Sequence, residues 1–173
     1  MIYKVKKTTS IIFSVILIGL LIALDQYTKV LAVNNLMDKE DFILIPGVLQ
    51  LHYLENTGAA FSILSGKQWV FAIITPVLLL ILLFILIRMP QVKKFTFLNY
   101  IIILLIAGAI GNYIDRLSNS YVVDFIYFSL INFPVFNVAD IYVTCGVIAL
   151  FLLILFYYKD EDLEEIKQRL LFK

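Results

Sequence analysis

Six ionisable residues lie within or beside long apolar stretches of this 173-residue chain. They are Asp25, Lys29, Asp115, Arg116, Asp124 and Asp140, and three asparagines, Asn56, Asn112 and Asn137, are their candidate neutral polar partners. An ionisable group at membrane depth costs about 2.5–3.5 kcal/mol on insertion scales, so each of the six is a candidate functional residue. We therefore look for the chemistry of this chain among these nine side chains.

Asp124 and Asp140 are the strongest candidates for catalysis. Each follows apolar residues, in Tyr-Val-Val-Asp and Asn-Val-Ala-Asp, and neither has an adjacent cation. Two carboxylates brought together in a partly dry place share a proton, because both cannot easily ionise. Such a pair suits peptide hydrolysis, since the ionised partner takes a proton from water while the protonated partner polarises the scissile carbonyl. The same two residues could equally form a cation site or a proton relay.

Helical spacing relates the remaining candidates. Asp25 and Lys29 are four residues apart and share a helix face, where they could support a site or simply neutralise each other. Asn112 and Arg116 share a face in the same way. Gly108 and Gly111 are expected to let two helices pack closely.

Other kinds of site are disfavoured by composition. One cysteine excludes a disulfide framework, and a single histidine beside it argues against a His/Cys metal site. The formal net charge of +1 gives no electrostatic footprint for nucleic acid. We expect neither a His/Cys metal site nor a nucleic-acid partner.

The elements that carry these residues are expected to be membrane helices. The chain is 62% hydrophobic and 16% charged, with a mean hydropathy of +0.96, whereas soluble domains are about 45–50% apolar and about 25% charged. Crossing the hydrocarbon core takes about 20 apolar residues. Four segments qualify, at about 11–33, 69–87, 95–114 and 138–158.

The distribution of basic residues predicts the orientation. Lysines and arginines concentrate at the N-terminus, between the second and third segments, and in the tail. Because basic residues favour the cytoplasmic side, both termini are expected to be cytoplasmic. The candidate residues then converge near the outer face of the membrane.

Two outer connections, at about 38–67 and 117–135, are expected to form a small cradle. Residues 42–45 and 48–54 are predicted strands on either side of Pro46-Gly47, and residues 121–128 could pair with them. Residues 59–64 are apolar and could lie along the membrane interface. Beyond the last span, residues 159–173 are predicted to form a short surface helix.

Five short motifs resemble those of the lipoprotein signal peptidase (signal peptidase II) family. In chain order they are Asp25-Gln26-Tyr27-Thr28-Lys29 (DQxTK), Asn56-Thr57-Gly58-Ala59-Ala60-Phe61 (NxGAAF), Gly111-Asn112-Tyr113-Ile114-Asp115-Arg116 (GNxxDR), Val122-Val123-Asp124-Phe125-Ile126 (VVDFI) and Phe136-Asn137-Val138-Ala139-Asp140 (FNxAD). No single motif is decisive, but the ordered set is specific and covers nearly all of the chain outside its tails.

The resemblance implies a single membrane-embedded peptidase domain over residues 1–173. Its fold class would be an all-α polytopic membrane protein, with four transmembrane helices, a small extracytoplasmic β-cradle and a short interfacial helix. The implied activity is that of a bacterial plasma-membrane aspartic endopeptidase, which removes the signal peptide from a diacylglyceryl-modified prolipoprotein just before the lipidated cysteine. No metal or cofactor is implied, and a monomer of this size suffices to form the site.

The same resemblance assigns roles to the candidate residues. Asp124 and Asp140 would be the catalytic pair, while Asn112, Arg116 and Asn137 would position the substrate or the pair. Asn56 and Gly58 would belong to the outer segment that closes over the substrate, and Asp25 with Lys29 would support the site from the first helix. Asp115 has no assigned role, and it could pair with Arg116 or cap the helix end.

Three other classes of protein compete with this interpretation. A small ion- or proton-coupled carrier could use the aspartates as cation ligands, although the chain shows no inverted repeat. In a non-catalytic scaffold the costly aspartates would have no purpose. A serine or metallo membrane peptidase is disfavoured because the chain has no HExxH motif, and Ser62 with Lys67 is only a coincidence of spacing.

Overall fold

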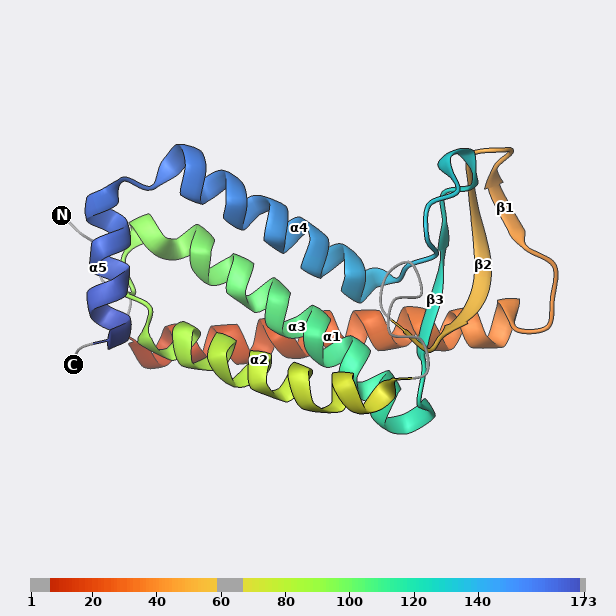
Figure 1. Ribbon diagram of the computed structural model, residues 1–173, viewed down its shortest axis with the longest axis horizontal. Helices are drawn as coiled ribbons and strands as arrows, with labels where there is room; N and C mark the ends of the chain where they lie inside the picture. Colours follow the sequence, from red (N-terminus) through yellow and green to blue (C-terminus); the bar gives the residue numbers. More distant parts are fainter. Residues whose placement is uncertain (1–6, 59–66, 172–173) are drawn as a thin grey trace.

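Four long apolar helices dominate the computed structural model, which describes residues 7–58 and 67–171 (Figure 1). They are α1 (Lys7–Leu36), α2 (Gln68–Arg88), α3 (Thr96–Asn119) and α4 (Val138–Leu152), the last continued by a π-helical turn, η4 (Leu153–Tyr157). By length and composition, each of the four can cross a membrane. The four-helix membrane fold predicted from hydropathy is thus confirmed.

The central helix of the bundle is α3. In its most apolar stretch 44% of the residues are buried, against 6% in that of α2. Ile103 and Ile106 of α3, and Phe95 directly before it, are almost completely buried. On the side facing α4, glycine lets the backbones approach, because a Cβ added at Gly108 would lie 2.6 Å from the carbonyl oxygen of Ala139. The close packing predicted at this glycine is therefore present.

A three-stranded antiparallel sheet lies at one end of the bundle (Figure 1). Its strands are β1 (Phe42–Ile45), β2 (Leu49–Asn56) and β3 (Val122–Tyr127), in the order β1-β2-β3. Gly47 makes the β1–β2 turn with φ +70°, a conformation that glycine adopts without strain. The sheet rests on the end of α1, and this packing holds β3 against the bundle. Ala32 and Leu36 of α1 and Val123 and Phe125 of β3 form a buried cluster there.

The opposite end of the bundle is covered by α5 (Asp160–Leu171), close to where α1 begins (Figure 1). Leu163 and Ile166 pack against the hydrophobic core that contains Phe95, Ile103 and Ile106. Asp162 pairs with Lys94 and accepts a hydrogen bond from the backbone N–H of Lys159 at 3.1 Å. The predicted tail helix is confirmed, whereas the predicted interfacial segment at 59–64 lies outside the described residues.

Candidate active site

Asp124 and Asp140 come from different elements and face one open cavity of about 1350 Å³. Asp124 lies on β3 and is 1% exposed, and Asp140 lies in the first turn of α4. Asn56, Asn112 and Arg116 contribute to the same cavity wall. The fold thus brings together residues that are far apart in sequence, at the junction between the sheet and the helix bundle.

Asn137 connects the two carboxylates. It is the N-cap of α4. Its side-chain oxygen accepts a hydrogen bond from the backbone N–H of Asp140 at 3.0 Å, and its backbone N–H donates to the Asp140 carboxylate at 3.1 Å. This reciprocal arrangement is a capping box, which satisfies two backbone N–H groups at the helix start. The Asn137 Nδ2 donates in addition to Asp124 Oδ1 at 2.6 Å. One fully buried amide therefore fixes both aspartates.

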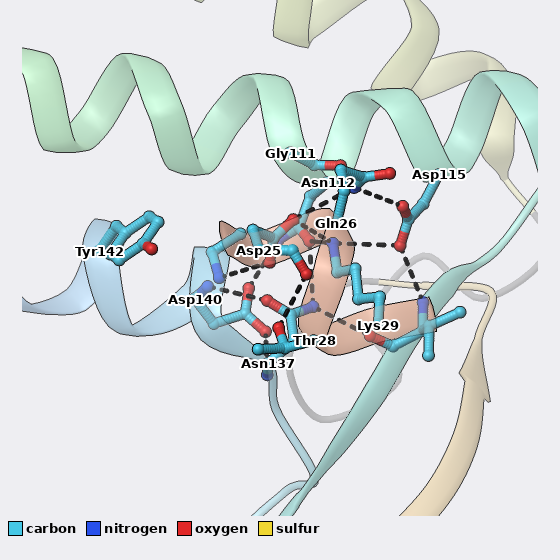
Figure 2. A network of polar contacts seen from close by, with 12 residues as sticks. Asp25, Gln26, Thr28, Lys29, Gly111, Asn112, Asp115, Asn137, Asp140 and Tyr142 are labelled. Atoms are coloured by element: carbon cyan, nitrogen blue, oxygen red, sulfur yellow. Dashed lines mark hydrogen bonds and ion pairs between the residues drawn. The ribbon is translucent and has the colours of Figure 1, made fainter. Parts of the chain in front are cut away.

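Asn112, on α3, holds Asp140 from the other side. Its Nδ2 donates to Asp140 Oδ1 at 2.7 Å, while its Oδ1 accepts from Lys29 Nζ at 2.9 Å and from Asn137 Nδ2 at 3.0 Å (Figure 2). Because the Lys29 ammonium can only donate, it fixes which end of the Asn112 amide faces it. The amide nitrogen of Asn112 must then point toward Asp140.

Lys29 lies at the centre of a buried ionic cluster beside Asp124 and Asp140. Its Nζ is 2.9 Å from Asp25 Oδ2 and 3.0 Å from Asp115 Oδ2, and its side chain is 4% exposed. Asp25 is completely buried and its Oδ1 accepts from the backbone N–H of Ala139 at 2.9 Å. This cluster therefore connects α1 with α3 and with the start of α4.

The ionic cluster requires a glycine on α3. A Cβ added at Gly111 would lie 2.5 Å from Asp25 Oδ2, closer than real contacts allow. Gly111 thus makes room for a buried carboxylate, in addition to the close helix approach that its sequence context predicted.

Asp115 has a partner that the sequence did not suggest. The structure shows neither a pair with Arg116 nor a helix-end cap at Asp115, whose ion pair is with Lys29. Its Oδ2 accepts from the backbone N–H of Val123 at 3.1 Å, and its Oδ1 accepts from Gln26 Nε2 at 2.9 Å. The sequence patterns did not single out Gln26, although it lies between the two charged residues of the DQxTK string.

Asn56, Gly58 and Arg116 also line the cavity. Asn56 donates to Asp124 Oδ2 at 2.8 Å and accepts from the backbone N–H of Gly58 at 2.9 Å. Arg116 donates to the Gly58 carbonyl at 3.0 Å, and its guanidinium lies 4.3 Å from the centre of the Phe71 ring. These contacts join the end of β2 to α3 and to α2.

Burial raises the pKa of Asp124 to about 7, with a further contribution from the negative charge of Asp140. The hydrogen bonds from Asn56 and Asn137 and the charge of Lys29 oppose this increase in pKa. Near neutral pH a substantial fraction of Asp124 is therefore protonated, and it can donate a hydrogen bond. In the described part of the chain, no group of three His, Cys, Asp or Glu side chains is arranged to hold a metal ion.

The sequence of this chain is similar to those of known proteins. Residues 17–156 match the family model described as signal peptidase (SPase) II. A lipoprotein signal peptidase of Streptococcus pyogenes serotype M5 is 43% identical over 143 residues, which cover 83% of this chain and 91% of the relative. A relative from serotype M3 of the same species is 42% identical over the same share of each chain.

Solved structures show the same architecture. A bacterial membrane enzyme solved by the in meso method at 2.3 Å is 37% identical, with a TM-score of 0.72 over 83% of this chain and 87% of the other. A second, at 1.9 Å, is 36% identical with the same TM-score, over 84% and 94% of the two chains. The family match covers most of the chain and includes all nine candidate residues. This protein is a bacterial membrane protease that belongs to the signal peptidase II family.

Proposed function

We propose that this chain is an aspartic endopeptidase in which Asp124 and Asp140 form the catalytic pair. The observation that carries the proposal is the cavity faced by both carboxylates, which come from β3 and α4 and are joined by the amide of Asn137. The rise in the Asp124 pKa to about 7 supports a protonated Asp124 beside Asp140 near neutral pH. This is the state that activation of water by a carboxylate pair requires.

In the proposed reaction Asp124 carries the proton and donates a hydrogen bond to the scissile carbonyl oxygen. Asp140 is ionised and takes a proton from water, whose oxygen attacks the carbonyl carbon. The proton of Asp124 passes to the developing oxyanion, which gives a tetrahedral gem-diol. Collapse of this intermediate breaks the C–N bond, and a proton from the pair goes to the leaving amine.

The supporting residues keep the two carboxylates in place during these steps. Asn112 and Asn137 each donate to one or both aspartates, while Asp25 and Lys29 hold Asn112 and the start of α4 from the α1 side. A displacement of about 1 Å in such a site can cost about a hundredfold in rate.

Arg116, Asn56 and Gly58 line the same cavity as the two aspartates, where the substrate backbone would bind. An arginine guanidinium carries five N–H donors, which can bind the carbonyl oxygens of a peptide backbone. The Asn56–Gly58 contact orients the Asn56 amide toward Asp124. We assign these three residues to substrate positioning.

The proposed substrate is a prolipoprotein whose cysteine carries a diacylglyceryl group, cleaved just before that cysteine. The S. pyogenes relatives are named lipoprotein signal peptidases, and this chain shares most of its length with them. A diacyl chain would keep the substrate in the bilayer with its scissile bond near the interface. The signal peptide helix could then dock along α4, whose outer half contributes Ile141 and Thr144 to the cavity.

We further propose that both termini face the cytoplasm and that the site lies at the outer face of a bacterial plasma membrane. The sheet lies at one end of the bundle, and α5 lies at the other end, where α1 begins (Figure 1). The basic residues concentrate in the segments at the α5 end. The site draws only on residues of one chain, which supports a monomer. Membrane lipid is then the only other partner that the proposal needs.

Purified protein in lipid, given one prolipoprotein with and without the diacylglyceryl group, tests the proposal. We expect cleavage before the lipidated cysteine, read by mass, and loss of cleavage in Asp124→Asn and in Asp140→Asn. Asp162→Asn, which changes a buried carboxylate at the opposite end of the bundle, is the matched control and should cleave normally. Cleavage at the wild-type rate by Asp124→Asn or by Asp140→Asn would refute the proposal that these two residues form the catalytic pair.

A further inference from the structure

Asp115 is a buried carboxylate that no step above uses. It is 4% exposed, lies on α3 one turn beyond Asn112, and does not contribute to the wall of the catalytic cavity. Both of its oxygens nevertheless have partners. Oδ2 pairs with Lys29 and accepts from the backbone N–H of Val123, and Oδ1 accepts from Gln26. Burying a charge is costly, so a carboxylate with three donors in this place calls for a functional explanation.

The first connection leads from Asp115 to Asp140. Asp115 Oδ2 lies 3.0 Å from Lys29 Nζ, and Lys29 Nζ in turn lies 2.9 Å from Asn112 Oδ1. Asn112 then donates to Asp140 Oδ1 at 2.7 Å (Figure 2). Asp115 therefore fixes the ammonium group that orients the amide holding Asp140.

A second connection leads to Asp124. Asp115 accepts from the backbone N–H of Val123, the residue directly before Asp124 on β3. This contact, at 3.1 Å, joins the outer end of α3 to the strand that carries the other catalytic carboxylate. Gln26 holds the second oxygen of Asp115 and also donates to the Gly111 carbonyl at 3.1 Å, so the carboxylate cannot easily rotate.

We infer that Asp115 is a positioning residue for both members of the catalytic pair, acting on Asp140 through Lys29 and Asn112 and on Asp124 through the β3 backbone. The inference rests on the proposed function, because it assumes that these two carboxylates do the chemistry. Asp115 touches neither of them and does not line the substrate cavity. Its loss should therefore lower kcat while leaving KM nearly unchanged.

The charge of Asp115 gives a second readout. Lys29 lowers the pKa of Asp124, and Asp115 partly cancels that effect because it lies against the same ammonium. Asp41, His52, Glu55, Arg116 and Asp140 line the cavity together with Asp124, and Asp25 and Asp115 form ion pairs with Lys29, whose charge acts on Asp124. Replacing Asp115 with Asn removes one negative charge from this group, so the pKa of Asp124 should fall.

The test uses the full-length protein in lipid with the diacylglyceryl-modified prolipoprotein. For Asp115→Asn we expect kcat to fall about tenfold to a hundredfold, with KM within about twofold of wild type. The alkaline limb of the pH–rate profile should move about 0.5–1 unit toward lower pH. Asp162→Asn is the matched control, because Asp162 is also buried, paired with a lysine and bonded to a backbone N–H.

Asp162→Asn should leave kcat and the pH limb unchanged. Asp115→Glu keeps the charge but lengthens the side chain, so kcat should fall while the limb stays in place, and this variant also serves if Asp115→Asn does not fold. Wild-type kcat in either folded Asp115 variant would overturn the inference, as would a loss of kcat in Asp115→Asn without movement of the limb. Activity in Asp124→Asn or Asp140→Asn would instead overturn the catalytic pair, and the inference with it.

Discussion

Replacing Asp124 with Asn should abolish cleavage and, at neutral and alkaline pH, make the folded protein more stable relative to wild type. Burial raises the pKa of Asp124 from the ordinary 3.8 to about 7. A carboxyl whose pKa is raised on folding binds its proton more tightly in the folded state. Its contribution to stability is greatest below the unfolded pKa and is lost progressively as the pH rises through the folded pKa.

The magnitude follows from these two pKa values. Relative to an unfolded carboxyl at 3.8, a folded pKa of about 7 costs the folded state about 2 kcal/mol at pH 5 and about 4 kcal/mol at pH 8. The Asp124→Asn variant would carry no such cost, since an amide does not titrate. The difference in unfolding free energy between variant and wild type should therefore shift by about 2–3 kcal/mol in favour of the variant between pH 5 and pH 8.

Hydrogen bonding at the side chain that replaces Asp124 changes the difference in unfolding free energy by an amount that does not depend on pH. Asn56 and Asn137 both donate to the Asp124 carboxylate. A rotation of the Asn56 amide by about 180° would lose its bond from the Gly58 N–H, and the same rotation of the Asn137 amide would lose its bond from the Asp140 N–H. The new amide nitrogen therefore meets a donor, which costs about 1–3 kcal/mol. For this reason the pH dependence of the difference is the quantity to measure.

Thermal unfolding in detergent, followed for both proteins from pH 5 to pH 8, gives the required comparison. At about 2–4 °C per kcal/mol for a chain of this size, the difference in Tm should change by about 5–10 °C across this range. Asp162→Asn is the control, because the ion pair with Lys94 lowers the pKa of Asp162. The stabilisation by ionised Asp162 is lost only as the pH falls below about 4. The difference in Tm between Asp162→Asn and wild type should therefore stay constant from about pH 5 to pH 8. Parallel Tm profiles for wild type and Asp124→Asn would refute the claim that Asp124 is desolvated.

Three further outcomes are expected. The wild-type kcat/KM should fall about tenfold per pH unit above about pH 7, as Asp124 loses its proton; a rate that stays flat to pH 9 would contradict the assigned role. Gly111→Ala should lower stability by about 1–3 kcal/mol and reduce cleavage, because its Cβ would lie 2.5 Å from Asp25 Oδ2, whereas Gly19→Ala has nothing within 4 Å and should be neutral. Arg116→Lys should lower kcat/KM about tenfold, since an ammonium cannot hold Gly58 and stack on an aromatic ring as a planar guanidinium does; an unchanged rate in steady-state kinetics would leave Arg116 as an anchor only.

Patterns between sequence neighbours predicted most of the fold. Long apolar runs predicted the four helices, and the Pro46-Gly47 turn between apolar segments predicted β1 and β2. The pairing of Asp25 with Lys29 follows from their spacing of one helical turn. Local hydrogen bonding likewise joins Asn137 and Asp140, because a capping box needs only residues at the N-cap and three positions later. The signals for these features lie within a few residues of one another, so the sequence alone was enough to predict the helices, the turn and the ion pair.

The partners that complete the site depend on how those elements pack. The sequence left Asp115 without a role, because its ion pair with Lys29 forms only when α1 and α3 lie side by side. Its bond to the Val123 N–H depends in addition on where β3 rests against α1. Glycine at position 111, with no Cβ, leaves room for the Asp25 carboxylate between α1 and α3. Residue types and short spacings thus determined which side chains could take part in catalysis, while helix packing and sheet placement decided which of them meet, since a buried charge is stable only where its partners converge.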